Sequence, residues 1–226
     1  MSVITIDGPA GSGKSTVSRL LAEKLGYIYL DTGAMYRAVA LAAKENNVPV
    51  DDEKKIGRFC RSVDLSFDLD QDPPGLFYNG ADISKRIRTP EIDMLASDVS
   101  AVRIVRHEMR RLQRQMAKGV NIVAEGRDMG TEVFPSARYK FFLTASIETR
   151  SRRRYAERLN RGETVSLEEV KKEMQKRDAQ DQMRSVAPLR PAKDAKIIDS
   201  SFLTPEKVVE EMMRHIDAGH VSCGNV

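Results

Sequence analysis

Short apolar runs alternate with longer stretches of helical periodicity along this chain. Five runs have the length of a buried strand, and they cover residues 3–6, 27–30, 120–124, 139–143 and 196–199. Between them, apolar positions recur every three or four residues, as on one face of a helix. This alternation predicts an α/β fold in which a five-stranded parallel sheet carries helices on both faces.

Two stretches break the alternation, and the first predicts a small separate sheet. Residues 63–70 alternate apolar and polar side chains, residues 71–75 predict a turn, and Asn79-Gly80 predicts a hairpin turn after residues 76–78. This pattern is typical of an antiparallel sheet with one solvated face. The apolar positions between Ile92 and Met116 then predict one long helix or two in series.

The second break, residues 150–164, is rich in arginine. A helical period places five of these side chains on one face: Arg150, Arg153, Arg154, Arg158 and Arg161. Ser166 and Glu169 then form a capping box that opens a helix running toward Asp181 and Arg184, whose i, i+3 spacing places both on one helix face. Thr204-Pro205 opens the last helix, and we expect residues 217–226 to fray.

A phosphate-binding motif follows the first apolar run. Gly8-Pro-Ala-Gly-Ser-Gly13-Lys14-Ser15 matches the pattern G-x-x-x-x-G-K-[ST], and a helical pattern comes directly after it. This placement directs backbone N–H groups and the positive end of a helix dipole to one point, where a phosphate chain fits. We therefore expect ATP or GTP here, and the alternative of a Gly-rich turn with a solvated lysine is disfavoured.

Each part of this P-loop has an expected role. Lys14 reaches the β- and γ-phosphates, and the Ser15 hydroxyl is a ligand of Mg²⁺. The expected nucleotide contacts are Gly8, Pro9, Ala10, Gly11, Ser12, Gly13, Lys14, Ser15 and Thr16.

Composition and charge limit the classes of molecule that this protein is expected to bind. The 226 residues are 41% hydrophobic, which is enough for one buried core, and the net charge of +4 is a mild excess. Arginine gathers in residues 103–114 and 150–161, while aromatic residues make up only 6% of the chain, so phosphate clamps are favoured over a nucleic-acid surface. The apolar run at residue 3 resembles neither a signal peptide nor a membrane span, so we expect a cytoplasmic protein. Cys60 and Cys223 are interpreted as ordinary thiols.

The remaining residues indicate a kinase. The sequence has no Asn-Lys-x-Asp segment, which lowers the GTPase interpretation, and no strand ending in the two carboxylates of an ATPase motor. Phosphoryl transfer is catalysed mainly by cations around the transferred group, and a phosphate acceptor needs no general base. A sequence rich in arginine, with no recognisable pattern among its histidines, therefore suits an anionic acceptor.

Three further motifs extend this interpretation. They are Asp31-Thr-Gly-Ala-Met-Tyr-Arg37, Glu125-Gly-Arg-Asp-Met-Gly130 and Arg177-Asp-x-x-Asp181-x-x-Arg184-x-x-Ala-Pro-Leu189. With the P-loop and these motifs in order, the chain resembles bacterial cytidylate kinases from end to end. The resemblance implies one P-loop kinase domain over 1–226, with a core of about 1–36, 107–148 and 185–226. A monophosphate-binding insert of about 37–106 and an arginine-rich lid of about 149–165 complete it.

The resemblance also implies roles for individual residues. Arg37 and Arg127 match the arginines that hold the acceptor phosphate, and Thr32 lies beside it. Residues around the cytosine match Ser97, Arg106 and Asp128, and those at the ribose hydroxyls match Asp181 and Arg184. The implied catalytic residues are Lys14, Arg127, Arg150, Arg153 and Arg154, with Ser15 as the assigned protein contact to Mg²⁺.

Purely structural interpretations of several of these residues stay open. Arg106 is also compatible with a solvated helix edge, and Asp181 with Arg184 is compatible with a surface pair. Arg127 and Asp128 are compatible with an internal ion pair, and the arginine stripe at 150–161 with a solvated or nucleic-acid-binding face.

The favoured function is ATP-dependent, in-line phosphorylation of CMP and dCMP in pyrimidine nucleotide metabolism, by a monomer that needs no nucleic acid or membrane. The alternatives are a P-loop kinase for UMP, AMP or shikimate and, more remotely, a nucleic-acid-binding ATPase.

Overall fold

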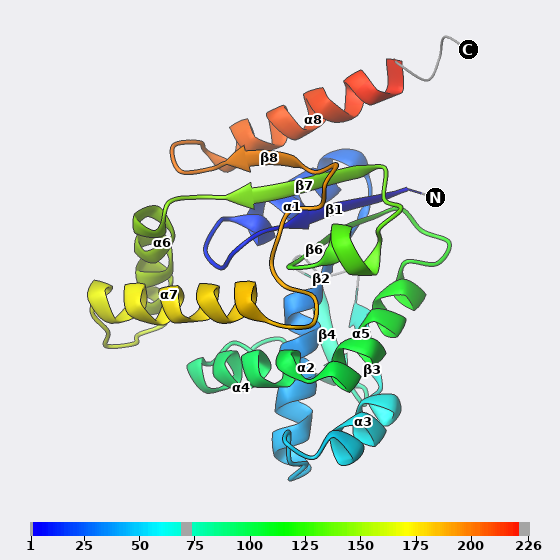
Figure 1. Cartoon of the computed structure of the whole chain (residues 1–226), viewed down its shortest axis with the longest axis vertical. Coiled ribbons are helices and arrows are strands. Elements are labelled where there is room, and N and C mark those ends of the chain that lie inside the picture. Colours follow the sequence, from blue (N-terminus) through cyan, green and yellow to red (C-terminus); the bar gives the residue numbers. More distant parts are fainter. Residues whose placement is uncertain (1, 69–73, 222–226) are drawn as a thin grey trace. The chain divides into compact units, whose positions relative to one another are not determined.

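The computed structural model describes residues 2–68 and 74–221 (Figure 1). The chain divides into two compact units. Unit 1 comprises Met1–Tyr27 and Asn121–Val226, and unit 2 comprises Ile28–Val120. The division into core, insert and lid concerns function and stays a prediction.

Parallel strands form the centre of unit 1. They are β1 (Val3–Asp7), β6 (Ile122–Gly126), β7 (Tyr139–Thr144) and β8 (Lys196–Asp199). With β2 (Ile28–Asp31), the sheet has five strands in the order β2-β6-β1-β7-β8, which confirms the predicted sheet. β6 begins later than expected because Gly119, at φ 80°, turns the chain before pairing starts at Ile122. The last residue of β1, Asp7, lies opposite Gly126, the last residue of β6.

Helices cover this sheet. Unit 1 contains α1 (Lys14–Leu25), the π-helical turn η1 (Met129–Val133), α6 (Ile147–Asn160), α7 (Leu167–Met183) and α8 (Pro205–Val221). α1 packs against both β6 and α8, and α6 packs against α7. The predicted capping box of α7 is present: the Ser166 hydroxyl accepts the Glu169 N–H, and the Glu169 carboxylate accepts the Ser166 N–H.

The last helix continues further than expected. α8 extends to Val221, so the prediction of fraying is wrong for residues 217–221. Ile216 is buried near the end of the helix and its carbonyl accepts a hydrogen bond from the Tyr139 hydroxyl at 3.1 Å, which anchors this part of α8. Residues 222–226, with Cys223, lie outside the described residues.

Unit 2 combines helices with the predicted small sheet. Its elements after β2 are α2 (Thr32–Glu45), α3 (Glu53–Ser62), β3 (Leu65–Asp68), β4 (Gly75–Tyr78), β5 (Ala81–Asp82), α4 (Pro90–Ala101) and α5 (Arg103–Met116). The three strands pair antiparallel, as predicted, and the expected turn at 71–75 falls partly on residues 69–73, outside the described residues. Asn79 and Gly80 both have positive φ, at 49° and 75°, which suits the hairpin turn.

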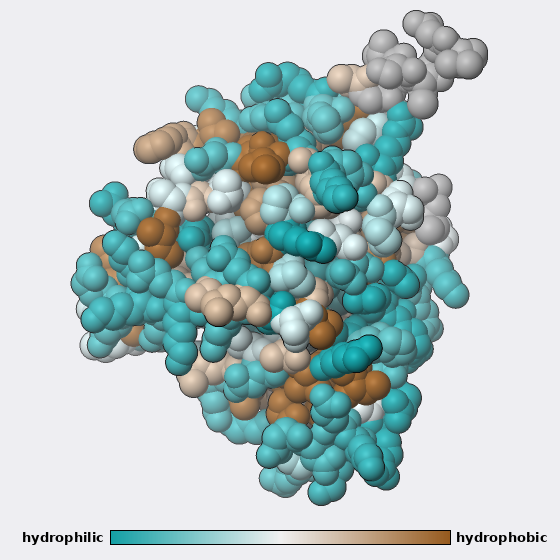
Figure 2. All heavy atoms as spheres, in the orientation of Figure 1, coloured by the Kyte–Doolittle hydropathy of each residue, from teal (hydrophilic) through white to brown (hydrophobic). Residues whose placement is uncertain are grey.

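The helical pattern of 92–116 resolves into two helices in series. The extended backbone of Val102, at φ −77° and ψ 122°, separates α4 from α5. α2 packs against α4, and α3 packs against α5. On the face shown in Figure 2, the outward side chains of α6 and α7 are mostly hydrophilic.

Candidate active site

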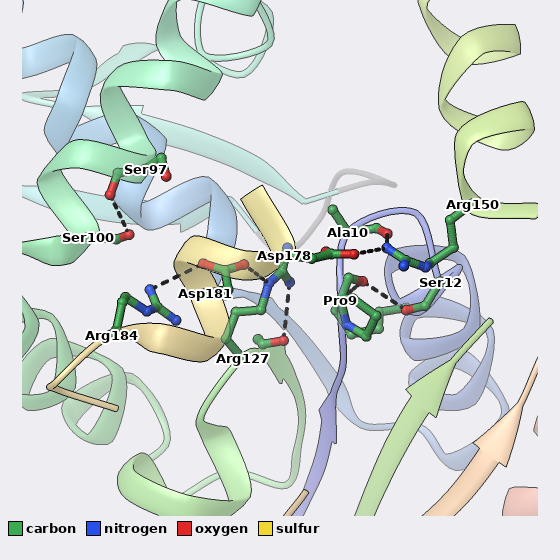
Figure 3. A network of polar contacts seen from close by, with 12 residues as sticks. Pro9, Ala10, Ser12, Ser97, Ser100, Arg127, Arg150, Asp178, Asp181 and Arg184 are labelled. Atoms are coloured by element: carbon green, nitrogen blue, oxygen red, sulfur yellow. Dashed lines mark hydrogen bonds and ion pairs between the residues drawn. The ribbon is translucent and has the colours of Figure 1, made fainter. Parts of the chain in front are cut away.

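The P-loop closes on itself around one backbone oxygen. The Pro9 carbonyl accepts hydrogen bonds from Lys14 Nζ at 2.7 Å and from the Ser12 hydroxyl at 3.1 Å (Figure 3). Gly11 and Gly13 have φ values of 73° and 91°, which favour glycine. The loop thus has the glycines and the lysine that a phosphate chain needs, and the lysine is held by the loop's own carbonyl.

The opening of α1 presents hydroxyl groups. Gly13 is the residue before the helix, and Ser15 and Thr16 in the first turn are exposed. A hydroxyl oxygen at a helix N-terminus is a suitable ligand for Mg²⁺, which keeps several waters when it binds beside phosphate. The chemistry of Ser15 therefore fits the metal. Among residues 2–68 and 74–221, no group of three or more His, Cys, Asp or Glu side chains forms a metal site.

Lys14 is buried in a cluster of charges. Burial lowers the pKa of its ammonium to about 7, Arg127 lowers it further, and the carboxylates of Glu125, Asp7 and Asp181 act in the opposite direction. Lys14 from the P-loop and Arg127 from the end of β6 therefore interact electrostatically within unit 1. Two cations held together at the carboxyl ends of adjacent strands indicate a site for an anion.

Asp7 joins the two strand ends. Its Oδ1 accepts the N–H of Met129 and its Oδ2 accepts the N–H of Gly130, both at 2.8 Å. Burial raises the pKa of Asp7 to about 7, and these two hydrogen bonds and Lys14 partly oppose that rise. Asp7 thereby holds η1, the turn that directly follows Arg127 and Asp128.

Arg127 is oriented by the end of α7. Its Nε lies 3.0 Å from Asp181 Oδ2 and its Nη1 donates to the Gly126 carbonyl at 3.3 Å, while Arg184 Nη1 lies 3.5 Å from Asp181 Oδ1. Burial acts to raise the pKa of Asp181, but Arg127, Arg184 and Arg177 outweigh it and the pKa lies below its ordinary value. Asp181 is therefore ionised between arginines.

This geometry bears on two of the alternatives that the sequence left open. Asp181 is 5% exposed, so the surface-pair interpretation of Asp181 and Arg184 is wrong. Arg127 does form an internal ion pair, with Asp181 from a distant segment. The expectation that Asp181 and Arg184 share a helix face is also wrong, because α7 ends at Met183 and Arg184 has an extended backbone at φ −56° and ψ 135°.

Two of the predicted lid arginines contact the P-loop. Arg150 Nη1 donates to the Ala10 carbonyl at 3.2 Å and lies 2.7 Å from Asp178 Oδ2. Arg153 Nη1 donates to the Ser12 carbonyl at 3.4 Å, and its Nη2 donates to the Ser200 carbonyl at 2.7 Å. These arginines therefore belong to the surroundings of the P-loop.

Arg154 and Arg158 lie further along α6, and Arg161 directly follows its last residue. Arg154 pairs with Glu157 at 2.9 Å, and Arg158 pairs with Glu163 and Glu173. Arg161 also pairs with Glu157. Each of these arginines has a carboxylate partner, so the positive charge of this part of the stripe is neutralised by neighbouring glutamates.

Unit 2 holds the other predicted acceptor residues. Arg37 on α2 donates from Nε to Asp93 Oδ1 on α4 at 2.6 Å, and Thr32 is buried at the start of α2. Arg106 on α5 is 3% exposed, which excludes the solvated-edge interpretation.

Arg106 also belongs to a small group of contacts. It donates from Nη1 to the Ser100 carbonyl at 3.1 Å, and its guanidinium lies 5.6 Å from the centre of the Tyr36 ring. Ser97 belongs to the same turn of α4, where its carbonyl accepts the Ser100 hydroxyl at 2.8 Å (Figure 3). Unit 2 thus brings Ser97 and Arg106 together through Ser100.

Four polar residues were not assigned roles from the sequence. Asp7 and Ser200 each come directly after a predicted strand, so their position at the edge of the sheet is a signal that the sequence contains. Asp178 lies inside the motif that begins at Arg177. Asp93 carried no signal, because it is recognisable only once α2 and α4 are packed together.

Comparison with known proteins identifies the family. The family model described as "Cytidylate kinase" matches residues 4–218. The chain belongs to the cytidylate kinase family. A cytidylate kinase of Geobacter sp. (strain M21) is 48% identical over 214 residues, which cover 95% of this chain and 92% of that protein. A cytidylate kinase of Caldicellulosiruptor bescii is 46% identical over 210 residues, which cover 93% of each chain.

A solved structure supports the fold alone. An uncharacterized protein from Eubacterium ventriosum matches with a TM-score of 0.50 and 14% identity, covering 96% of this chain and 99% of that one. Membership of the cytidylate kinase family confirms the resemblance seen in the sequence. Within residues 2–68 and 74–221, every helix is too short or too polar to span a lipid bilayer.

Proposed function

We propose that this chain transfers the γ-phosphoryl group of ATP to CMP and dCMP, yielding ADP with CDP or dCDP. The observation that carries the proposal is the electrostatic cluster of Lys14 and Arg127 in a member of the cytidylate kinase family. One cation belongs to the phosphate loop and the other to the motif that the family resemblance assigns to the acceptor. A donor and an acceptor phosphate would therefore both find positive charge in this unit.

The donor binds residues 8–16. Backbone N–H groups of the loop hold its phosphates, Lys14 moves from the Pro9 carbonyl to the β- and γ-phosphate oxygens, and the Ser15 hydroxyl holds Mg²⁺. The metal, when bound, neutralises charge on the β- and γ-phosphates. Lys14 with Arg150, Arg153 and Arg154 stabilises the charge that develops on the transferred group.

Each of the three parts of the acceptor, the phosphate, the cytosine and the ribose, has its own proposed residues. Arg37 and Arg127 bind its phosphate, with Thr32 beside them, because guanidinium groups make paired hydrogen bonds to phosphate oxygens. Ser97, Arg106 and Asp128 recognise the cytosine, and Asp181 and Arg184 bind the ribose hydroxyls. Asp181 is ionised, so it can accept a hydrogen bond from a hydroxyl.

The acceptor phosphate oxygen attacks the γ-phosphorus directly. This oxygen is already ionised near neutral pH, so the step needs no general base and forms no phosphoenzyme. Closure of the segment 149–165 would exclude water, which otherwise hydrolyses ATP. We place the enzyme in the cytoplasm as a monomer that serves pyrimidine nucleotide metabolism and requires neither nucleic acid nor membrane.

The test is a coupled ADP-release assay with CMP, dCMP, UMP, AMP and shikimate as acceptors. We expect the highest kcat/KM with CMP or dCMP and loss of activity in Lys14→Met. No turnover with either cytidine nucleotide would overturn the proposal. ATP hydrolysis stimulated by single-stranded RNA, with binding that falls steeply as salt rises, would instead favour the nucleic-acid-binding ATPase.

A further inference from the structure

One face of α7 carries three side chains in succession. Met174, Asp178 and Asp181 are four and three residues apart, which places them on the same side of a helix. All three are at least largely buried: Met174 and Asp181 are each 5% exposed, and the Asp178 side chain is 14% exposed. Each of them faces a part of the candidate active site.

The first two side chains lie beside the P-loop, Met174 next to Gly11 and Asp178 through Arg150. A Cβ atom at Gly11 would lie 2.9 Å from Met174 Cε and 3.0 Å from the Arg150 carbonyl, so the loop fits closely against α6 and α7. Asp178 Oδ2 lies 2.7 Å from Arg150 Nη1, and the same nitrogen donates to the Ala10 carbonyl at 3.2 Å (Figure 3). Arg150 Nε also donates to the Ala145 carbonyl at 2.9 Å, which fixes the plane of the guanidinium.

The third of these side chains, Asp181, contacts the segment that is assigned to the acceptor. Asp181, one turn after Asp178, pairs with Arg127 at the end of β6. Successive turns of one helix therefore hold two arginines, one at the P-loop and one in the segment assigned to the acceptor.

We propose that Asp178 is a positioning residue for ATP, which acts by holding Arg150 against the Ala10 carbonyl of the P-loop. Asp181 has the corresponding role for the acceptor, through Arg127. The inference rests on the proposed function and deepens it, since it divides the carboxylates of α7 between the two substrates.

Charge and burial support a role beyond packing. The Arg150 side chain is 8% exposed, and a guanidinium buried to this extent needs a counterion to keep a defined position. Asp178 supplies that charge through one oxygen. Its other oxygen, Oδ1, is buried and makes no hydrogen bond to any residue of the described ranges. A buried oxygen without a partner lowers stability, so an apolar side chain would serve packing alone equally well. What the carboxylate adds is the orientation of Arg150.

The experiment compares Asp178→Asn with Asp181→Asn in the full-length protein. For Asp178→Asn we expect KM for ATP to rise about tenfold, the effect of losing one charge-assisted bond, with KM for CMP within about twofold of the wild type. For Asp181→Asn we expect the reverse. Equal increases of both constants in Asp178→Asn, or no increase for ATP, would overturn the inference.

A matched control separates positioning from helix packing. Glu148 and Lys171 also link α6 to α7, at 3.2 Å, but the Glu148 side chain is 57% exposed. Glu148→Gln should leave both constants unchanged, and an ATP effect equal to that of Asp178→Asn would show that any α6–α7 link matters. If Asp178→Asn lowers the melting temperature strongly, Arg150→Lys replaces it, because it keeps the charge for Asp178 but lacks the fork that reaches Ala10.

A double variant and a binding measurement complete the test. If Asp178 acts through Arg150, then Asp178→Asn with Arg150→Gln should raise KM for ATP no more than Arg150→Gln alone. Titration with a non-hydrolysable ATP analogue should show the same weakening in Asp178→Asn. This binding measurement needs no acceptor, so it still judges the inference if CMP is not the substrate.

Discussion

The carboxylate of Asp7 accepts the N–H of Gly130 at 2.8 Å, although the two residues are 123 positions apart. The contact ties the end of β1, where the P-loop begins, to the turn after β6. The turn approaches β1 closely at Gly130, where a Cβ atom would lie 3.0 Å from Thr5 Oγ1. The donor loop and the turn that follows Arg127 therefore share one anchor.

Asp7→Asn should lower kcat/KM for CMP by about tenfold, because the amide offers one acceptor to two N–H groups and places its NH₂ against one of them. Initial-rate kinetics with varied CMP measure the effect. Asp194→Asn is the control, since it breaks the Lys140 ion pair at the 62% exposed Asp194. Wild-type kinetics in Asp7→Asn would contradict the anchoring role.

The stability of the free protein should rise between pH 7 and pH 10. The folded pKa of Lys14 is lowered from 10.5 to about 7, so the unfolded chain binds more protons in this window. The free energy of unfolding then increases with pH, with a contribution of at most about 1.4 kcal/mol per pH unit from this group. Urea denaturation at pH 7, 8 and 9 should show a smaller increase in Lys14→Met. Parallel pH profiles of the two proteins would refute the assignment.

Arg154→Ala and Arg184→Ala should affect different kinetic constants. Arg154 is proposed to follow the charge of the transferred group, so its loss should lower kcat. Arg184 is proposed to bind the ribose through its position beside Asp181, so its loss should mainly raise KM for CMP. Steady-state kinetics with both substrates varied separate the two effects. The roles are misassigned if both variants change the same constant.

Gly8→Ala should destabilise the protein by several kcal/mol, beyond the effect of its positive φ of 151°. A Cβ atom there would collide with the Leu143 carbonyl oxygen of β7. Gly26→Ala is the matched control, because Gly26 also has a positive φ, 64°, but open space around it, so only about 1–2 kcal/mol should be lost. Equal melting temperatures of the two variants would show that the close approach of β1 and β7 is unimportant.

Local signals predicted most of the fold. The P-loop, the Asn79-Gly80 turn and the capping box at Ser166 each depend on a few adjacent residues, and the structure contains all three. Strand ends depend on more than the apolar run, because the turn at Gly119 precedes β6 and pairing starts only at Ile122.

The site required tertiary information. Asp7 meets Met129 across 122 positions, and no periodicity connects them. The spacing of Arg184 from Asp181 predicts that both lie on one helix, but the chain leaves the helix at Met183 on its way to Ala187, which has a positive φ of 50°. The family resemblance supplied residue roles, while the structure supplied the neighbours that orient these residues.

The register of α7 carries a constraint on insertions and deletions. An α-helix rotates by about 100° and rises by about 1.5 Å per residue, so removing a single residue between Asp178 and Asp181 would turn one carboxylate away while leaving the other in place. Substitutions on the outer side of this helix leave its phase intact. We therefore expect related enzymes to vary freely in the composition of that outer side, and to keep the number of residues from Met174 to Asp181 unchanged.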